Sequence, residues 1–245
     1  MSEPVTVRQW TGKTFRIRLN RPAQGNAFSA DLVRSLDEAL DDAQSGDAQA
    51  VVIEGAGKHF CTGFDLSGLD AETDDTLLAR FVRIELLLQR VSRMPMTTVV
   101  LGHGRVMGAG ADLFAACTVR AAKAGTSFAF PGSKGFGIAL GSRRLAVCVG
   151  RARAQEWIEG GRAVARDEAG ASGLVNVDVE RIDDAWLTEG AVRFARSAGN
   201  RWVDEAMNGN ARSEDSSDLW ALAHSAAGPG LRDRIAQYVR GTVRS

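Results

Sequence analysis

Glycines and one acidic residue follow a short apolar run near the middle of the chain. Thr98–Leu101 predicts a buried strand, residues 102–110 carry four glycines, and helical apolar spacing begins at about Ala109. Glycine lets a backbone come close to a ligand, and the first amides of a helix have no internal acceptor. Asp112 lies on that first helical turn and can face whatever the amides hold. Alone, the pattern also fits a βα turn whose glycines only pack a helix on a sheet.

A second stretch repeats the arrangement. Val51–Glu54 predicts another short strand, and the loop that follows, 55–66, contains Gly55, Gly57 and Gly63. Two such loops can each direct one backbone N–H at a single oxygen. That is an oxyanion hole, which stabilises the charge that builds up on a carbonyl in a transition state.

Both loops, with further motifs in order along the chain, resemble the crotonase, or enoyl-CoA hydratase/isomerase, superfamily. The motifs are Leu19–Pro22 with Asn26 and Ala27, Phe60–Leu66, Gly108–Leu113, Phe128–Pro131, Gly141–Leu145 and Gly173–Val175. The resemblance covers about residues 5–180. It implies an α/β fold built as a crotonase-like spiral of ββα units with a helical C-terminal portion. We expect a core over residues 1–182 that holds the acyl-CoA site, and helices over 183–245 that build a homotrimer or hexamer.

The resemblance also implies a reaction and its residues. The substrate would be an acyl-CoA thioester, whose enolate is stabilised by the backbone N–H groups of Phe64 and Ala109, with Asp112 as the acid–base residue. Such an enzyme is a hydratase or isomerase and needs no metal and no cofactor beyond the coenzyme A that the substrate carries. The substrate-binding positions that follow from the motifs are Phe64, Asp65, Leu66, Ser67, Gly108 and Gly132.

Gly132 and Ser67 are among the positions that depart from the family pattern. Hydratases of this family use a second glutamate, which would fall at Gly132, and glycine has no side chain for acid–base work. This departure also widens the pocket. Ser67 stands where a lysine that holds the adenine end is common, which leaves Arg21, Lys58, Arg143 and Arg144 as candidates to bind coenzyme A.

The missing glutamate keeps other functions open. One alternative is a crotonase-fold protein that has lost its chemistry and serves as a binding or regulatory partner. Another is a C–C bond hydrolase that acts on a diketone with the same two amides. His59 and His103 can titrate near neutral pH, but we interpret them as structural, and Cys61 as a filler of the loop.

The composition of the chain limits which partners and which cellular location we expect. The 245 residues are 44% hydrophobic, and 30 basic residues balance 30 acidic ones, so neither nucleic acid nor an anionic membrane is an expected partner. No apolar run approaches the ~20 residues that span a bilayer, and the N-terminus has no apolar signal-peptide core. Three cysteines without metal-like spacing indicate free thiols, and we expect a cytoplasmic protein.

Hydrophobic periodicity predicts the elements around these loops. We expect a hairpin over Val5–Gln9 and Thr14–Leu19, a helix capped by Ser29, and a helix over 73–93. Residues 132–141 are expected to form a loop, and Leu174–Val179 a late strand. The remaining predictions are a parallel strand at Ala50–Ile53, a helix at 109–116, strands at Thr118–Ala122 and Ser127–Phe130, and helices at Ser142–Val149 and Ala152–Glu159.

Overall fold

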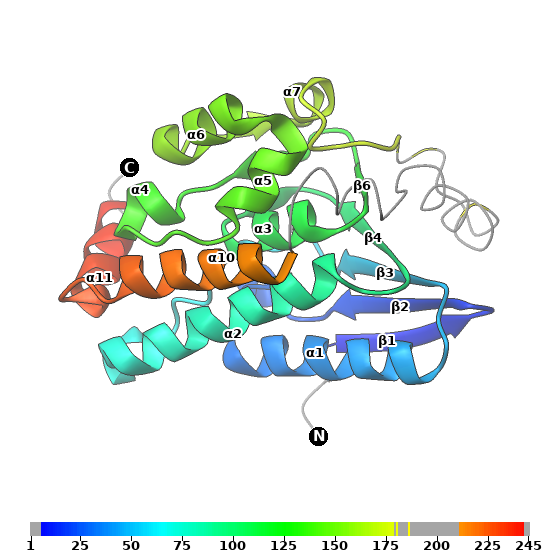
Figure 1. Cartoon of the computed structure of the whole chain (residues 1–245), viewed down its shortest axis with the longest axis horizontal. Coiled ribbons are helices and arrows are strands. Elements are labelled where there is room, and N and C mark those ends of the chain that lie inside the picture. The colour runs from blue at the N-terminus through cyan, green and yellow to red at the C-terminus, as the bar shows by residue number, and fades with distance from the viewer. Residues whose placement is uncertain (1–5, 179, 181–185, 187–210, 243–245) are drawn as a thin grey trace.

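The computed structural model describes residues 6–178, 180, 186 and 211–242. Figure 1 shows a layered α/β arrangement, with a sheet flanked by helices α1 and α2 and with α5 and α6 stacked beyond α3. The larger sheet has the strand order β1-β2-β3-β4-β6. Its strands are β1 (Thr6–Thr11), β2 (Thr14–Leu19), β3 (Ala50–Gly55), β4 (Thr97–Gly102) and β6 (Val119–Ala122).

The register of this sheet follows the apolar pattern of the sequence. β1 and β2 form the predicted antiparallel hairpin, and every later pair is parallel. Ile17 lies beside Ile53, and Ile53 lies beside Val100, so branched side chains line up across three strands on one buried face. The alternate residues, such as Val52 and Val99, are buried on the opposite face. Continuous apolar runs are typical of parallel strands that are buried on both faces of a sheet.

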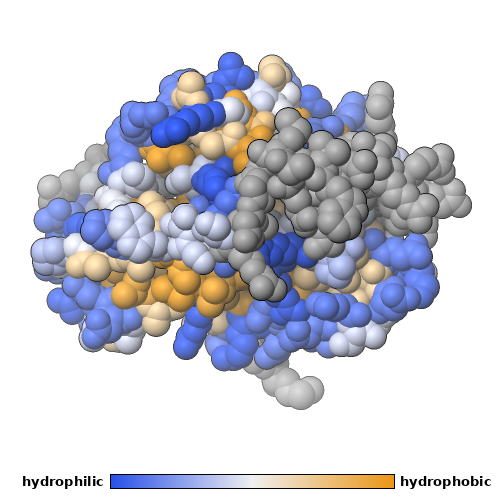
Figure 2. All heavy atoms as spheres, viewed as in Figure 1, coloured by the Kyte–Doolittle hydropathy of each residue, from blue (hydrophilic) through white to orange (hydrophobic). Residues whose placement is uncertain are grey.

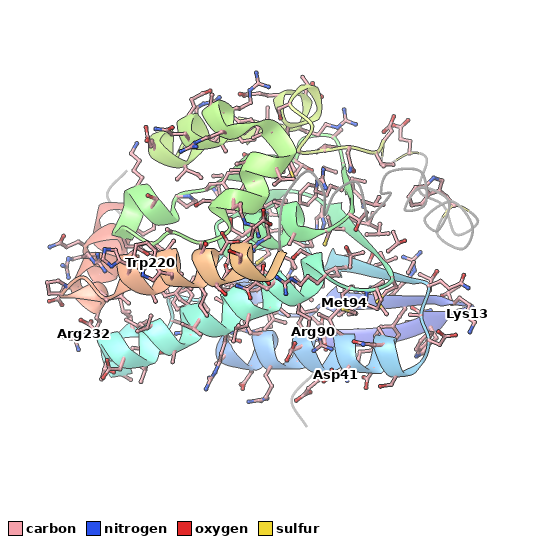
Figure 3. All side chains as sticks on the ribbon, in the orientation of Figure 1. Lys13, Asp41, Arg90, Met94, Trp220 and Arg232 are labelled. Atoms are coloured by element: carbon pink, nitrogen blue, oxygen red, sulfur yellow. The ribbon has the colours of Figure 1, made fainter. Side chains whose placement is uncertain are left out.

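Two long helices cover the first face. α1 (Ala30–Ser45) begins at Ser29, whose hydroxyl accepts a hydrogen bond from the backbone N–H of Leu32. Leu32, Leu36 and Leu40 are fully buried along one side, and each such side chain contributes about 1.5–3 kcal/mol. α2 (Asp74–Ser92) begins with a capping box at Thr73. Figure 3 shows Arg90 of α2 reaching toward Asp41 of α1, to which it donates a hydrogen bond.

The central strand–turn–helix unit holds one strand that the sequence analysis missed. β4 leads through a turn into β5 (Arg105–Met107) and then directly into α3 (Ala109–Ala116). β5 pairs with β7 (Ser127–Ala129), which pairs with β8 (Val164–Ala165), and these three form a second sheet. The glycine-rich turn predicted before α3 therefore contains a strand that was not predicted, because residues 105–107 add an edge strand to the second sheet.

The region after β7 corrects two more predictions. Residues 132–141 were expected to be a loop, but Gly132–Phe136 form the short helix α4, which ends at Gly137 with a left-handed conformation. In place of the expected strand at Leu174–Val179, the described residues form one isolated bridge between Val177 and Ala121. The two predicted helices that are split at Gly150 are confirmed. The helices of this region are α5 (Ser142–Val149), α6 (Arg151–Gly160) and α7 (Arg166–Ala171), and two single 3-10 turns lie at Pro22–Gln24 and Leu69–Ala71.

Two C-terminal helices complete the described chain. α10 (Ala211–Ala226) lies along α2, and α11 (Leu231–Thr242) packs against α4 at the end of α2 (Figure 1). Leu222, Leu231 and Ile235 are buried with Leu77 and Phe81 of α2 in a separate apolar cluster. These helices therefore cover the end of the core that carries α4, and the expected assembly role of residues 183–245 stays a prediction.

Candidate active site

The two glycine loops meet at Gly63 and Gly108. Gly63 has φ 103° and Gly108 has φ 50°, conformations that side-chain-bearing residues rarely adopt. A Cβ on Gly63 would lie 3.1 Å from the carbonyl oxygen of Met107, and a Cβ on Gly108 would lie 3.6 Å from Cα of Gly63. The two backbones are thus in direct contact, and the residues that follow them, Phe64 and Ala109, are brought side by side.

Neighbouring strands hold this contact in place. The carbonyl of Gly63 accepts a hydrogen bond of 2.7 Å from Phe28, and the N–H of Gly108 donates one of 2.9 Å to Ala129. Between them, the carbonyl of Cys61 accepts from Met107 at 2.9 Å. Both glycines therefore sit in a backbone framework that fixes the direction of the next peptide unit.

The backbone N–H groups of Phe64 and Ala109 remain available to a ligand. Among the described residues neither N–H donates to a protein acceptor, and Ala109 is the first residue of α3, where no intrahelical acceptor exists. Both residues line one cavity of about 80 Å³. This is the arrangement that an oxyanion hole requires, with two donors from different loops beside one cavity.

Asp112 supplies the acidic group of this cavity. It lies on the first turn of α3, is 5% exposed, and lines the cavity. Its carboxyl makes no hydrogen bond within the described part of the chain. Burial raises the pKa of Asp112 well above its usual value, the positive charge of Arg144 opposes the rise, and Glu85 adds to it. A carboxyl group with a raised pKa is a stronger base than an ordinary one and is suited to take up and return protons.

An ionic cluster lies behind Asp112, where α2, α5 and α10 meet. Arg144 of α5 donates to both carboxylate oxygens of Glu85, at 2.6 and 2.5 Å, and to Asp218 of α10 at 3.1 Å. Arg144 and Glu85 are 5% and 1% exposed, so this is a buried pair. Arg143 binds Asp218 and Glu214 of α10. Arg143 and Arg144, two of the four coenzyme A candidates, are therefore engaged inside the protein.

The other two coenzyme A candidates differ from each other. Arg21 donates to Asp65 at 2.8 Å and to the carbonyl of Ala27 at 2.8 Å, so it serves to hold the first loop. Lys58 is exposed on the loop after β3, and no ion pair involves it in the described residues. Of the four, Lys58 alone is exposed and makes no ion pair in the described residues.

The cavity brings together six of the eight predicted site residues. Phe64, Leu66, Gly108, Ala109, Asp112 and Gly132 line it. Asp65 is instead buried beside the cavity, where it pairs with Arg21 and accepts the N–H of Ser67 at 3.0 Å. Hydrogen bonds from Ser67 and Arg21 outweigh the effect of desolvation, which is the largest single influence, and lower the pKa of Asp65. Ser67 is exposed outside the cavity.

The histidines and the loop cysteine take structural positions, as interpreted from the sequence. The ring of His59 accepts the N–H of Arg105 at 3.2 Å, and the ring of His103 contacts the carbonyl of Gly57 at 3.0 Å. Neither lines the cavity. Cys61 is fully buried, and burial raises the pKa of its thiol to about 12, which makes it a poor nucleophile.

Sequence reasoning missed the far wall of the cavity. Phe81 is one of the buried apolar residues of α2, and Phe136 and Tyr238 belong to no motif. All three line the cavity. The helical spacing of apolar residues in α2 could have identified Phe81 as a candidate for the cavity wall. Nothing in the local sequence distinguishes Tyr238, which lies on α11.

Comparisons with known proteins agree with this geometry. The Enoyl-CoA hydratase/isomerase family model matches residues 11–208. The chain is 34% identical over 179 residues, 71% of its length, to the probable enoyl-CoA hydratase echA6 of Mycobacterium tuberculosis, and covers 70% of that protein. It is 32% identical over 166 residues to YngF of Bacillus subtilis, a protein assigned to enoyl-CoA hydratase/isomerase, and this match covers 65% of the chain and 63% of YngF.

Solved structures give the same result over a greater length. A structure from Bordetella parapertussis, assigned to enoyl-CoA hydratase/isomerase, superposes with a TM-score of 0.83 at 36% identity and covers 97% of this chain and 99% of that one. An enoyl-CoA hydratase/isomerase from Xanthobacter autotrophicus gives a TM-score of 0.75 at 25% identity, covering 99% and 94%. The chain belongs to the enoyl-CoA hydratase/isomerase, or crotonase, superfamily and has its α/β fold with two mixed sheets and C-terminal helices.

No helix in the described ranges is long and apolar enough to cross a membrane. The same ranges contain no group of three or more His, Cys, Asp or Glu side chains arranged to hold a metal ion.

Proposed function

We propose that this protein is an enzyme that binds an acyl-CoA thioester and stabilises its enolate between the N–H groups of Phe64 and Ala109. The observation that carries the proposal is the contact between Gly63 and Gly108, which leaves two unused backbone donors beside one cavity. When a proton leaves the α-carbon, negative charge moves to the thioester oxygen. One donor aimed at that oxygen is typically worth about 3 kcal/mol.

Asp112 is the proton carrier in this proposal. In double-bond isomerisation of a 3-enoyl thioester, its carboxylate takes a proton from the α-carbon, and the electron pair moves into the enolate. The enolate then collapses as the same carboxyl group returns the proton to the γ-carbon, so the reaction consumes no water and needs one acid–base residue. The raised pKa of Asp112 supports this role, because a stronger base takes the α-proton more readily.

Gly132 favours isomerisation over efficient hydration. Water addition in two-glutamate hydratases uses a second carboxyl group, and at this position the chain has only a hydrogen atom. The other polar side chains that line the cavity, Thr62, Ser133, Ser142 and Tyr238, are hydroxyl groups, which are weaker acids and bases than a carboxyl near neutral pH.

The same glycine supports a second candidate, an acyl-CoA-binding protein without catalysis. One experiment separates the two. The protein and its Asp112→Asn variant are titrated calorimetrically with short, long and aromatic acyl-CoAs and then assayed with crotonyl-CoA and a 3-enoyl-CoA. Turnover that is lost in Asp112→Asn supports the enzyme. Binding without turnover in either protein supports the binding role, and folded protein that binds no acyl-CoA contradicts both.

An assembly of three or six copies is part of the proposal. Figure 2 shows apolar side chains along α2 on the face that it shares with α10, and Leu86 of α2 and Trp220 of α10 are 48% and 67% exposed. Burying such side chains against a second copy would remove them from water. Analytical ultracentrifugation of the full chain tests this, since a monomer at micromolar concentration contradicts it.

A further inference from the structure

Four aromatic rings run from the oxyanion loop to the last described helix. Phe64 stacks on Phe81 of α2 with ring centroids 4.3 Å apart, Phe81 meets Phe136 of α4 at 6.0 Å, and Phe136 meets Tyr238 of α11 edge-on at 5.5 Å. All four line the cavity that contains Asp112. The cavity therefore starts at the carbonyl-binding amides and ends at a wall of rings.

The first ring is fixed from behind by Arg80. Its guanidinium lies 4.1 Å from the centre of the Phe64 ring, and it also donates to the carbonyl of Asp65 at 2.8 Å and to Glu72 at 2.7 Å. A cation over an aromatic face is attracted by the ring quadrupole. Phe64 thus cannot turn aside to lengthen the cavity without losing its contact with Arg80 and its stacking on Phe81.

The last ring lies close to the backbone of α4 at Gly135. A Cβ on Gly135 would be 2.8 Å from two carbon atoms of the Tyr238 ring, so only glycine at this position admits the ring so closely. Tyr238 is half-buried, with one edge toward Phe136 and the cavity. The side of the ring that packs on Gly135 and Phe136 has little room to move, because packed side chains leave little free volume.

The helix that carries Tyr238 is anchored far from the ring. The carboxylate of Asp74, at the start of α2, accepts the backbone N–H groups of Arg232 at 2.8 Å and Gly230 at 3.1 Å. Figure 3 labels Arg232 at the start of α11, at the outer end of the molecule. Leu231 and Ile235 are fully buried. Tyr238 can therefore leave the wall by a movement of the whole helix α11 only if these contacts of α11 are broken.

We infer that Tyr238 is a specificity-determining residue that limits the length of the acyl group, so that the protein takes short-chain acyl thioesters. The inference rests on the proposed acyl-CoA function. The cavity volume of about 80 Å³ is far below the roughly 300–1,000 Å³ of pockets that hold drug-sized ligands. An acyl chain that extends beyond this volume requires the wall of rings to move.

The test measures binding of butyryl-, hexanoyl- and octanoyl-CoA, with free coenzyme A as a reference, to four proteins. These are the parent, Tyr238→Ala, Tyr238→Phe and the matched control Gln237→Ala, which changes the exposed neighbour on the same helix. Each methylene group that leaves water strengthens binding roughly fourfold. We expect the ratio of octanoyl to butyryl affinity to rise tenfold or more in Tyr238→Ala. The ratio should stay at the parental value in the other two variants.

Three results would overturn the inference. One is a parent that binds all three lengths equally well, and another is a Tyr238→Ala variant with an unchanged ratio. The third is an equal loss for every ligand, free coenzyme A included, which would place Tyr238 at the mouth of the site. Tyr238→Leu serves as the second variant if Tyr238→Ala does not fold. Folded parent that binds no acyl-CoA refutes the proposed function itself and is thus distinguished from these outcomes.

Discussion

The backbone of Gly141 lies directly against the carboxyl group of Asp112. A Cβ at Gly141 would be 2.3 Å from Oδ1 and 2.5 Å from Cγ of Asp112, and Gly141 itself has φ 65°. Gly141 is also the residue at which α5 begins. One glycine therefore both turns the chain into α5 and leaves the room that the buried acid occupies.

Gly141→Ala should consequently displace Asp112. We expect a loss of stability of about 1–3 kcal/mol from the left-handed backbone and the contact, together with a clear fall in kcat for 3-enoyl-CoA isomerisation. Gly125→Ala is the matched control, since Gly125 has φ 74° and a Cβ there meets nothing within 4 Å. The control should lose stability only. An equal fall of kcat in both variants would show that the contact with Asp112 has no role.

The raised pKa of Asp112 has a signature in stability. Burial holds the folded-state pKa above the value in the unfolded chain, so the unfolded chain loses this proton first as pH rises. Between the two pKa values, stability falls by about 1.4 kcal/mol per pH unit. Asp112→Asn removes this effect and should be more stable than the parent at pH 7. The advantage should shrink as pH falls toward about 4, the unfolded carboxyl range.

Urea denaturation of both proteins between pH 4 and pH 8 measures this difference. Asp70→Asn, at an exposed position of the 3-10 turn Leu69–Ala71, serves as the control and should leave stability unchanged. If the difference in free energy of unfolding between Asp112→Asn and the parent does not vary with pH, the raised pKa of Asp112 is contradicted.

Gly132→Glu should raise the rate of water addition to crotonyl-CoA. Gly132 begins α4 without a left-handed φ, and a Cβ there meets only the carbonyl oxygen of Ile138 at 3.5 Å, an ordinary contact. A glutamate can therefore enter the cavity wall without backbone strain, and a positioned acid–base group is typically worth about 10²–10⁴ in rate. Gly132→Gln has the same shape without the acid and should gain nothing. Equal rates in both variants, with acyl-CoA binding retained, would refute the prediction.

The buried pair between Arg144 and Glu85 should behave as a unit. Arg144→Met leaves Glu85 buried without its partner, and we expect a loss of about 3–5 kcal/mol. The double variant Arg144→Met, Glu85→Met removes both charges and should be more stable than Arg144→Met alone. Chemical denaturation of the two single variants and the double variant gives the coupling energy. Additive losses would mean that the pair does not act as one unit.

Much of the fold could be predicted because its signals are local. Ser29 caps α1 as expected, α2 lies within the expected range 73–93, and the apolar runs of β3 and β4 became adjacent parallel strands. β5 and β8 were missed because they are short and become strands only by pairing with β7 in a second sheet. The glycines of 132–141 indicated a loop, but packing of Phe136 against Phe81 stabilises a short helix.

The candidate site divides in the same way. Phe64, Ala109 and Asp112 belong to continuous motifs, and the cavity contains all three. Asp65 was placed among the substrate-binding residues because of its motif, whereas its side chain holds Arg21. Tyr238 lies 126 positions beyond Asp112 in the sequence, and no local pattern reports which helix will close a cavity. Site residues that belong to a continuous motif can be predicted from the sequence. Site residues that reach the cavity only through tertiary packing cannot.

The contact between Gly63 and Gly108 also bears on how this protein can change over evolutionary time. The two donors beside the cavity are main-chain groups, so replacing the side chain of Phe64 or Ala109 does not delete either N–H. The aromatic wall, by contrast, consists of side chains from α2, α4 and α11 that single substitutions alter freely. Drift in the coding sequence can therefore change which ligands fit the cavity, while the two main-chain donors are inherited with the backbone.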